Sequence, residues 1–376
     1  MKILHVLQTL DANKGGGITA RNLKLIEYLE NKNYQNFILT LNKKSEFIGI
    51  KNIPKKRVFN LYYLNERFPI PSPNVFKISS LIKDMDIVHL TSFWTLLNAY
   101  AYIFCKIFSK KYVICPAGSL LVFGRSKFLK YFYNFFFGNN IIKDSSAIIA
   151  ITEKEVEQFI SKNIPKEKIS KIPNGVELFN FNKVNLNKDK LIKFEKFSPY
   201  ILYVGRLNFI KGPDILLQAF DKIANQIPEY NLIFAGNDDG MGKELMRLAK
   251  ESQFSKRIKF VGFIKGINKE NLYKNANLLV IPSRSEAMSL VVLEAAYYGL
   301  ESIFTDQCGL EELENKSLGK SVPVDINLLA ESIKGFIHLN KQKKVNIELI
   351  KYVSNNFSWE KISNQYLKVF NDSYKK

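Results

Sequence analysis

Apolar and polar residues follow two alternating patterns along this chain. Short apolar runs rich in β-branched and aromatic residues predict buried strands at 2–7, 86–90, 112–115, 199–204, 231–236, 258–263 and 277–281. Amphipathic stretches with a period near 3.6 residues predict helices from a glycine-rich loop at 13–19 to about residue 29, at 214–224 and at 289–298. Strands that alternate with helices predict an α/β fold with parallel sheets, which bind ligands beyond the carboxyl ends of their strands.

The length of the chain predicts more than one domain. Its 376 residues suit two domains of ordinary size, and its 46% hydrophobic residues suffice for two cores. We place an N-terminal domain at 1–173, a linker rich in Lys and Asn at 174–198, and a second domain at 199–354. The proline-rich segment 54–73 is expected to form a mobile loop.

The main candidate for chemistry is the segment 283–296, which places Glu286 and Glu294 eight residues apart where a strand is expected to pass into a helix. Amides near Ser289 and Leu290 would be unpaired donors in the first helical turn, and the helix dipole is positive at this end. The segment therefore favours an anion. Taken alone, the two glutamates are better explained as a helix N-terminal acid and a surface acid than as a binding site.

A second strand-to-helix loop, at 205–213, carries two cations. Arg206 has a planar, forked group and Lys211 a flexible point charge, a pairing suited to gripping a diphosphate from two sides. With these cations at hand, the binding-site interpretation of Glu286 and Glu294 is favoured over two unrelated surface acids.

Three further polar positions have weaker patterns. His89 lies in a predicted strand, where it fits either a structural hydrogen bond or a substrate contact. Asp84 and Asp86 have the spacing of a metal-binding pair, but they precede a strand and are expected to cap it.

Four motifs together resemble a known family. They are Gly205-Arg206, Lys211-Gly212, Glu286 with Glu294, and 172–176 with the sequence Ile-Pro-Asn-Gly-Val. Their order and spacing resemble the retaining glycosyltransferases of family 4, which have the B-type fold. The resemblance covers nearly the whole chain and implies two Rossmann-like, doubly wound domains that face each other across a cleft. It also implies that a C-terminal helix at 355–376 crosses back toward the N-terminal domain.

The resemblance implies an activity and partners. A hexose-type sugar would pass from a nucleoside-diphosphate sugar to a glycan or a polyprenyl- or lipid-linked acceptor, with the anomeric configuration kept. The product would belong to a bacterial surface polysaccharide such as capsule or lipopolysaccharide. Because fixed cations can take up the charge of the leaving diphosphate, no metal or other cofactor is expected.

The resemblance also implies roles for individual residues. Arg206 and Lys211 would bind the diphosphate and stabilise it as it leaves, and Glu286 would lie beside the donor sugar; these three are the catalytic candidates. Glu294 would bind the ribose hydroxyls. The remaining donor-site candidates are Gly16, Gly17, Gly262, Phe263, Ser289 and Leu290, and the acceptor-side candidate is His89.

The formal net charge of +20 indicates attraction to an anionic surface such as a membrane leaflet. The segment 123–137 interleaves cations with aromatic residues, and a helix there would place Phe128, Phe132, Phe135 and Phe136 on one apolar side. Such a helix can lie in a lipid interface. It fits equally a core helix with a solvated basic edge.

Membrane-spanning and secreted classes are disfavoured. No apolar run reaches the roughly 18 residues that cross a bilayer, Met1-Lys2 leads directly into a predicted strand, and three cysteines lack metal-ligand spacing. We therefore expect a cytoplasmic protein, with peripheral binding to the cytoplasmic face of the inner membrane as a further hypothesis.

Two other functions stay open. A nucleotide-sugar epimerase of similar two-domain shape would need additional acid and base residues that we do not find. A basic nucleic-acid-binding protein would account for the charge. It would leave the arrangement of Arg206, Lys211, Glu286 and Glu294 unexplained, so no nucleic-acid partner is expected.

Overall fold

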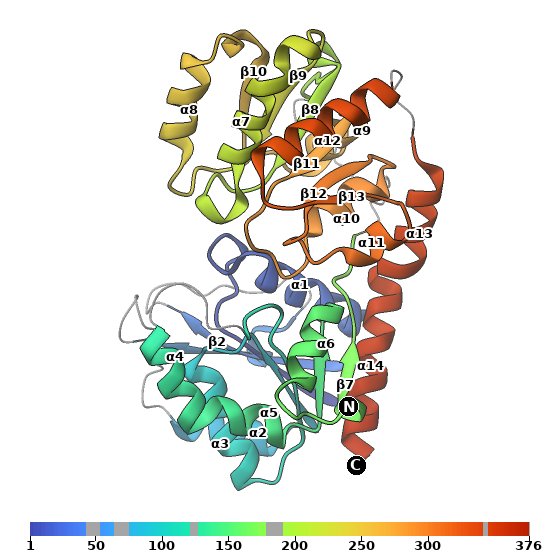
Figure 1. The fold of residues 1–376 in the computed structure, drawn as a ribbon. Helices are drawn as coiled ribbons and strands as arrows, with labels where there is room; N and C mark the ends of the chain where they lie inside the picture. The colour runs from blue at the N-terminus through green and yellow to red at the C-terminus, as the bar shows by residue number, and fades with distance from the viewer. Residues whose placement is uncertain (43–52, 64–74, 121–126, 178–190, 341–344, 376) are drawn as a thin grey trace. The chain divides into compact units, whose positions relative to one another are not determined.

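The computed structural model describes residues 1–42, 53–63, 75–120, 127–177, 191–340 and 345–375. The chain divides into two compact units, one of Met1–Gly175 with Trp359–Lys376 and one of Val176–Ser358. Each unit has a parallel sheet with helices packed on it (Figure 1). The predicted α/β class with two doubly wound sheets is confirmed.

The N-terminal unit has a seven-stranded sheet in the order β3-β2-β1-β4-β5-β6-β7. The strands are β1 Lys2–Leu7, β2 Gln35–Asn42, β3 Val58–Tyr62, β4 Ile87–Thr91, β5 Tyr112–Cys115, β6 Ala147–Ala150 and β7 Ile169–Lys171. The helices are α1 Ala12–Asn31, α2 Val75–Lys83, α3 Leu96–Ile107, α4 Lys127–Tyr133, the π-helix η2 Asn134–Gly138, α5 Asn139–Asp144, α6 Glu153–Ile160 and α14 Trp359–Lys375. The strand order reverses between β1 and β4, which is the switch point of a doubly wound sheet.

The second unit repeats this plan with a six-stranded sheet in the order β10-β9-β8-β11-β12-β13. The strands are β8 Tyr200–Val204, β9 Asn231–Ala235, β10 Ile258–Gly262, β11 Leu278–Ile281, β12 Ser302–Thr305 and β13 Lys320–Val322. The helices are α7 Pro213–Ile223, α8 Gly242–Glu251, α9 Gly266–Asn275, α10 Leu290–Tyr297, α11 Glu311–Asn315, α12 Ile326–Leu339 and α13 Ile347–Phe357. Its switch point lies between β8 and β11.

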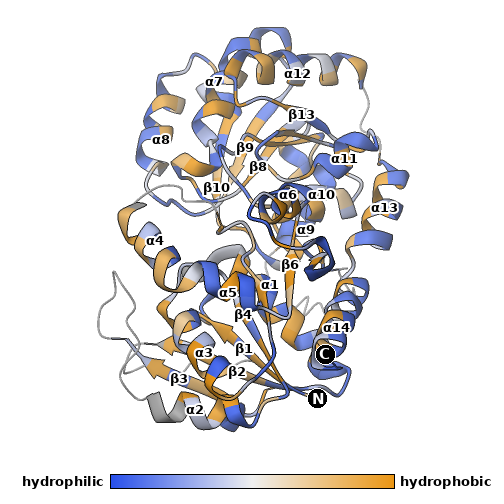
Figure 2. Cartoon of the chain, turned by 60° about the horizontal axis from the view of Figure 1, so that its bottom comes forward, coloured by the Kyte–Doolittle hydropathy of each residue, from blue (hydrophilic) through white to orange (hydrophobic). Residues whose placement is uncertain are grey.

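The central strands form because both faces of each sheet are covered. All residues of β4, β5, β11 and β12 are buried. Side chains on both faces of such a strand must be apolar, which accounts for the uninterrupted hydrophobic runs in the sequence. Figure 2 shows β4, with its neighbour β1, as largely orange. In the second unit, Tyr203, Phe220 and Phe234 are among the large side chains of the core.

The last helix, α14, belongs to the N-terminal unit although it ends the chain. It packs beside α1, where Trp359 stacks on Tyr28 with ring centroids 6.2 Å apart. A Cβ at Gly175 would lie 2.6 Å from the Trp359 ring, so only glycine permits this approach. The helix thereby closes one side of the N-terminal unit.

Two sequence expectations for the N-terminal unit need correction. The segment 54–73 is not all loop, because 58–62 forms the edge strand β3 paired with β2, and 64–74 lies outside the described residues. The predicted loop at 13–19 lies within α1, which is interrupted at Gly16 by a left-handed φ of 58°. Strand β3 was not expected because its hydrogen bonds come from the neighbouring strand β2, and the turn residues in the local sequence do not reveal that neighbour.

A buried histidine pair joins β1 to β4. His5 and His89 face each other in register, with their Nδ1 atoms 3.1 Å apart. The amide of Asn36 donates to Glu30 and to the Tyr34 carbonyl, so its oxygen accepts from His5 Nε2 at 3.0 Å. A neutral His5 then accepts at Nδ1 from His89, and a proton added to either ring would place a charge inside the buried pair.

We expect acid to destabilise the protein through this pair. Burial lowers the pKa of His5 to about 4 and that of His89 well below its ordinary value, with Arg21 opposing the charged form of His89 and Glu30 favouring that of His5. Between pH 6.5 and pH 4 the unfolded chain binds protons that the folded chain does not, so stability falls as pH drops through this window. His5 alone should lower the free energy of unfolding by roughly 2 kcal/mol between pH 7.5 and pH 5.

Urea denaturation at those two pH values measures this effect. The control is a variant with His5→Gln and His89→Leu, in which neither side chain titrates. An equally steep pH dependence in the variant would show that other groups cause it.

Candidate functional site

The candidate site lies at the carboxyl-end edge of the second sheet. Because β8 and β11 are parallel neighbours, the loops that follow them leave the sheet side by side at its switch point. These loops are 205–212 and 282–289, which carry the cations and the first glutamate predicted from the sequence. The topology therefore joins two motifs that are about eighty residues apart in the chain.

Two cations occupy the first loop in different surroundings. Arg206 is half-exposed and forms an ion pair with Asp239 at 2.8 Å. Lys211 ends a short 3₁₀ turn, Phe209–Lys211, whose N-cap Asn208 accepts a hydrogen bond from the Lys211 amide at 2.9 Å. The cap fixes the backbone that carries Lys211, while Arg206 has more freedom to meet a ligand.

Gly212 brings the two loops into contact. Its φ is 66°, and a Cβ at this position would lie 2.1 Å from the carbonyl oxygen of Pro282. The residue that follows Lys211 must therefore be glycine for two independent reasons, conformation and space.

Arg284 holds the loops together, a role that the sequence analysis did not assign. Its guanidinium forms a two-pronged ion pair with Asp214 at 2.9 and 2.6 Å and donates to the Phe209 carbonyl at 2.7 Å. The same group stacks over the Phe209 ring at 3.9 Å. An acid in the first turn of the predicted helix at 214–224 was the available signal, but its partner lies seventy residues away.

Glu286 contacts Lys211, one of the two cations that the sequence placed in the candidate site. The ammonium of Lys211 is 2.8 Å from Glu286 Oε2, and the Glu286 side chain is only 9% exposed. The hydroxyl of Ser283 donates to the other carboxylate oxygen, and the Glu286 amide donates to the Gln307 carbonyl at 2.8 Å. The structure thus pairs a cation and an anion that we had assigned to separate parts of a donor.

One expectation for the start of α10 is wrong. The amide of Ser289 donates to the carbonyl of Cys308 at 2.9 Å, so it is not an unpaired donor. The sequence did not reveal this because Cys308 lies in the loop after the neighbouring strand β12. The first-turn amides that remain for an anion begin at Leu290.

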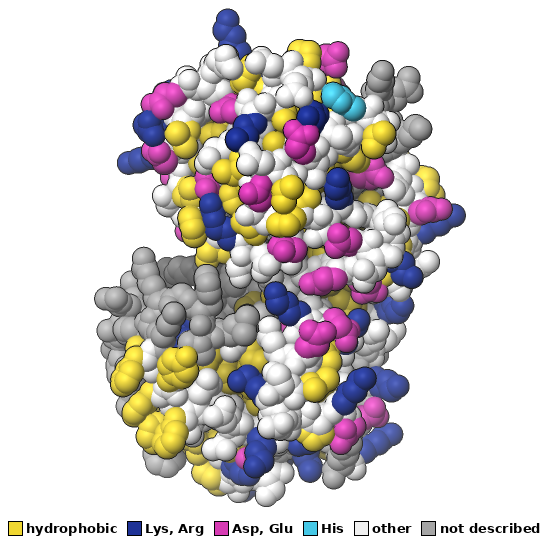
Figure 3. Space-filling model, viewed as in Figure 1, with side chains coloured by type: hydrophobic (Ala, Val, Ile, Leu, Met, Phe, Trp, Pro, Cys, Tyr) yellow, Lys and Arg dark blue, Asp and Glu magenta, His cyan; other side chains and the backbone are white. Residues whose placement is uncertain are grey.

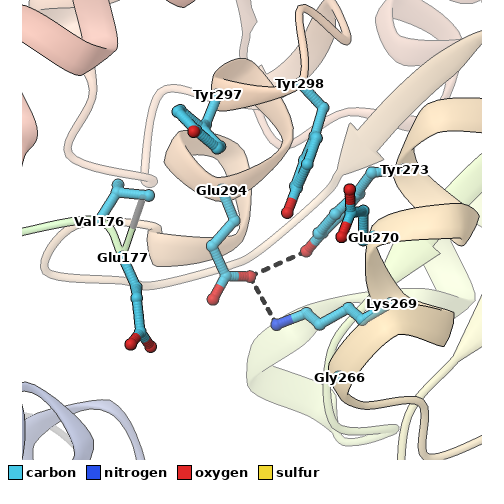
Figure 4. Close-up of a pocket in the computed structure, with 9 residues that line it drawn as sticks. All are labelled: Val176, Glu177, Gly266, Lys269, Glu270, Tyr273, Glu294, Tyr297 and Tyr298. Atoms are coloured by element: carbon cyan, nitrogen blue, oxygen red, sulfur yellow. Dashed lines mark hydrogen bonds and ion pairs between the residues drawn. The ribbon is translucent and has the colours of Figure 1, made fainter. Parts of the chain in front are cut away.

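Glu294 lies on α10, in a pocket of about 170 Å³ formed with α9 and the segment at Val176. Its Oε2 atom accepts from the Tyr273 hydroxyl at 2.9 Å and pairs with the Lys269 ammonium at 2.6 Å (Figure 4). Burial raises the pKa of Tyr273 well above its ordinary value, with Glu294 as a second cause, so the phenol keeps the proton that it donates. The contacts hold one oxygen of Glu294 and leave the other to face the pocket.

The pocket has a different chemical character from the loops beside it. Glu177 and Glu270 also line it, together with Tyr297 and Tyr298. Several carboxylates and phenols around one ammonium suit a ligand that donates hydrogen bonds, such as a diol, and disfavour a phosphate. Lys269 and Tyr273 were not among the predicted site residues; they lie four residues apart on α9, a helix that was not predicted, and this spacing places them on one face.

The remaining predicted donor-site residues are placed separately. Gly262 ends β10 with a φ of 70° and accepts a hydrogen bond at its carbonyl from the Gly236 amide, and Phe263 is exposed. Both lie at the same sheet edge as the two loops. Gly16 and Gly17 lie in the N-terminal unit near the start of α1, where a Cβ at Gly16 would meet no neighbour.

His89 does not meet the requirement of an acceptor contact in this structure. Its side chain is fully buried in β4 and is covered by Tyr366 and Phe370 of α14. Its Nε2 has no hydrogen-bond partner among the described residues. The structure favours the other interpretation, a structural histidine of the core.

Metal-binding and thiol chemistry find little support in the part of the chain that the structure describes. No group of three His, Cys, Asp or Glu side chains there could hold a metal ion. Asp86, one of the acidic pair, accepts a hydrogen bond from the Lys2 amide at 2.7 Å and so caps β1. Burial raises the pKa of the Cys308 thiol to about 12, which keeps it protonated.

Comparison with known families gives two matches that together cover most of the chain. The model of "Glycosyltransferase Family 4" matches residues 15–178, and that of "Glycosyl transferases group 1" matches residues 186–353. An uncharacterised glycosyltransferase of Methanocaldococcus jannaschii is 31% identical over 177 residues, which are 45% of each chain. The chain thus matches less than half the length of this relative.

Longer matches are more distant in sequence. An uncharacterised 41.2 kDa protein in the cps region of Klebsiella pneumoniae is 24% identical over 98% of this chain and 99% of its own. The structure of Anabaena Alr3699/HepE in complex with UDP has a TM-score of 0.78 at 19% identity, covering 99% of this chain and 100% of its own.

A second solved structure, the apo form of the lipopolysaccharide outer core galactosyltransferase WaaB, has a TM-score of 0.72 at 18% identity, covering 99% of both chains. At these identities, the solved structures show that the fold is shared over the full length. With two family models on successive halves of the chain and this fold throughout, the protein belongs to the group 1 glycosyltransferases of family 4 with the B-type fold.

Proposed function

We propose that the protein is a retaining glycosyltransferase that moves a hexose-type sugar from a nucleoside-diphosphate sugar to a glycan or lipid-linked acceptor. The observation that supports this most is the junction of loops 205–212 and 282–289 beside the start of α10. It gathers Arg206, Lys211 and the first-turn amides of a helix at one sheet edge. Positive groups of three kinds at one edge suit a diphosphate.

The charges define what each group would do. As the sugar–phosphate bond breaks, negative charge moves onto the phosphate oxygen that leaves, and Lys211 and Arg206 would take it up. Lys211 already pairs with Glu286 at 2.8 Å, so the ammonium is held in place before the donor arrives. Glu286, kept by Ser283 and Lys211, would face the sugar hydroxyls as a hydrogen-bond acceptor.

The pocket around Glu294 would hold the ribose. A ribose diol donates two hydrogen bonds, and a carboxylate can accept both. Lys269 and Tyr273 hold one oxygen of Glu294 and would orient the group. We expect the base to rest near Gly262 and Phe263.

The acceptor and product are proposed more broadly. The Klebsiella relative in the cps region and the lipopolysaccharide galactosyltransferase neighbour support a surface polysaccharide such as capsule or lipopolysaccharide. A polyprenyl- or lipid-linked acceptor would lie at the cytoplasmic face of the inner membrane, where the protein would work as a peripheral enzyme. Among the described residues, no helix is both long and apolar enough to cross a bilayer.

Thermal-shift measurements with the purified protein test the donor site. UDP, GDP, ADP and CMP, each with its common sugars, would be added without metal, because a ligand that binds the native state raises the melting temperature. We expect one nucleoside diphosphate to stabilise the protein, which would identify the base. If none does at millimolar concentration, the donor site as proposed is wrong.

A nucleotide-sugar epimerase of similar shape is the second candidate. It needs an acid and a base beside the sugar, but the carboxylates that contact the described loops are paired with cations: Asp214 with Arg284, Asp239 with Arg206 and Glu286 with Lys211. The two functions separate in one NMR experiment. An epimerase changes the donor sugar without any acceptor, whereas the proposed transferase keeps its configuration.

We expect transfer to continue in EDTA. Arg206, Lys211 and the start of α10 would supply the positive charge that a divalent metal supplies in other transferases. Initial rates with the identified donor, measured in EDTA and in added magnesium, should agree within about twofold. A loss of transfer in EDTA that magnesium restores would show that the cations are insufficient.

A further inference from the structure

An exposed aromatic surface on the N-terminal unit is not used by the proposed donor site. It consists of six residues of α4 and η2, which are 48% to 78% exposed: Phe128, Leu129, Tyr131, Phe132, Phe135 and Phe136. In Figure 3 hydrophobic side chains gather at the lower left of the molecule, in the region where Figure 1 places α4. A soluble monomer rarely leaves so many large apolar side chains together in water.

The helix is anchored on its opposite side, so the exposure is not a result of loose packing. Tyr133 and Phe137 pack against the core of the unit, and the Tyr133 hydroxyl donates to the Thr95 carbonyl at 3.1 Å. A Cβ at Gly138 would lie 2.9 Å from the Phe93 ring, which shows how closely this segment approaches the core. The outward face of a well-anchored helix is therefore apolar.

The outward side chains also contact one another. The rings of Phe132 and Phe136 are 4.5 Å apart, and those of Phe135 and Phe136 are 5.1 Å apart. The π turn of η2 widens the outward arc, because it places more residues in one turn than an α-helix does. The result is a continuous surface and not scattered single residues.

The charge of this unit indicates what covers the surface. The residues of the N-terminal unit include 30 of the 55 Lys and Arg and 14 of the 35 Asp and Glu, so this unit carries +16 of the net charge of +20. In the sequence, Arg125, Lys127 and Lys130 alternate with the aromatic residues. Two interactions bind a protein to a charged lipid interface: attraction of its cations to anionic lipids, and burial of its apolar side chains. This unit offers both.

We propose that this aromatic surface docks the protein on an anionic lipid bilayer, with the phenylalanines inserted among the acyl chains and the positive charge of this unit attracted to the lipid phosphates. Nucleic acid would meet the charge equally well. It would not require phenylalanine and leucine side chains that point outward without any polar group. The core-helix interpretation would bury the apolar side, but the structure exposes that side at 128–136, while 123–126 of the expected helix lie outside the described residues.

Co-sedimentation of the full chain with lipid vesicles tests the proposal. Vesicles of phosphatidylcholine alone are compared with vesicles that also contain phosphatidylglycerol, without donor or acceptor, so the result does not depend on the proposed transfer. We expect binding to the anionic vesicles at least about tenfold stronger than to the neutral ones, and weaker in high salt. Equal binding to both, or none to either, would overturn the proposal.

Two matched variants locate the binding surface. The first carries Phe128→Ser, Phe132→Ser and Phe135→Ser; the second carries Met246→Ser, Leu328→Ser and Leu339→Ser, which replace exposed apolar residues of the other unit. We expect the phenylalanine variant to bind anionic vesicles at least about tenfold more weakly than the wild type. The variant of the other unit should bind them as the wild type does. An unchanged first variant contradicts docking through this surface.

A depth measurement separates insertion from surface attraction. Trp94 lies beside this helix, with its ring 5.5 Å from the Lys130 ammonium. In a Trp359→Phe background it is the sole tryptophan, and brominated lipids should quench it in the wild type but not in the phenylalanine variant. Absent quenching would overturn insertion. If the wild type is a dimer that binds no vesicles and the phenylalanine variant is a monomer, the surface binds a second copy of the chain. If the wild type binds DNA and not vesicles, the surface binds nucleic acid.

Discussion

Lys211→Ala is expected to lower the turnover number by about two to three orders of magnitude, the range found when a charge-stabilising group is removed from a transition state. Lys211 is fixed by the Asn208 cap and points its ammonium at Glu286, 2.8 Å away. The leaving diphosphate would lose the cation that meets it as the bond breaks. Steady-state rates with the donor identified by thermal shift measure this loss.

The same substitution also changes stability, and the two effects can be separated. Glu286 is only 9% exposed, so without Lys211 a nearly buried carboxylate keeps Ser283 as its one side-chain partner among the described residues. We expect a loss of about 1–3 kcal/mol in the free energy of unfolding. Adding Glu286→Gln should restore stability but not turnover.

The control for Lys211 is Lys222→Ala on α7, an exposed lysine that donates to Asn327 at 2.8 Å. It carries the same charge on the same unit but lies away from the two loops in sequence. Full activity in Lys211→Ala, or an equal loss in Lys222→Ala, would refute the role assigned to Lys211.

Glu294→Ala is expected to weaken binding of the nucleoside diphosphate about ten- to a hundredfold, because it removes charged hydrogen bonds worth roughly 1.5–3 kcal/mol. The turnover number at saturating donor should change much less, since the ribose contact is the same in the ground state and the transition state. Calorimetric titration of the nucleotide into each variant gives the dissociation constants.

Nucleotides that lack a ribose hydroxyl make this test specific. The wild type should bind the 2′-deoxy or the 3′-deoxy nucleotide more weakly than the parent nucleotide. The Glu294→Ala variant should bind each deoxy nucleotide as tightly as it binds the parent. Tyr273→Phe, which removes only the hydroxyl that holds Oε2, should cost about three- to tenfold in affinity. If Glu294→Ala still discriminates against the deoxy nucleotides, Glu294 is not the ribose ligand.

The pattern of apolar runs determined the fold class and most of the central strands. β8, β9 and β11 lie within one residue of their predicted bounds, because a strand covered on both faces must be apolar throughout. The edge strand β3 was missed for the complementary reason. Its residues 58–62 are only partly buried, and a neighbouring strand, not the local sequence, gives them their hydrogen bonds.

The sequence also indicated the residue types of the candidate site but not their contacts. Arg206, Lys211, Glu286 and Glu294 could be named from motif order and spacing. Motif order and spacing could not predict three sets of contacts. They are the pairing of Lys211 with Glu286, the ion pair of Arg284 with Asp214, and the contacts of Lys269 and Tyr273 with Glu294. Each joins segments from about twenty to about seventy-five residues apart, and the switch point of the sheet brings the most distant of them together.

Burial separates what the sequence by itself determined from what only the tertiary structure decided. The sequence determined which side chains can ionise, bond or pack, and therefore the family, the α/β class and the residue types of the site. The tertiary structure decided that His89 lies beneath α14, that the Ser289 amide is already bonded to Cys308, and that Phe128 and Phe135 face outward. Periodicity shows that a helix has an apolar side, but a neighbouring element must either cover that side or leave it exposed, and elements distant in sequence make that choice.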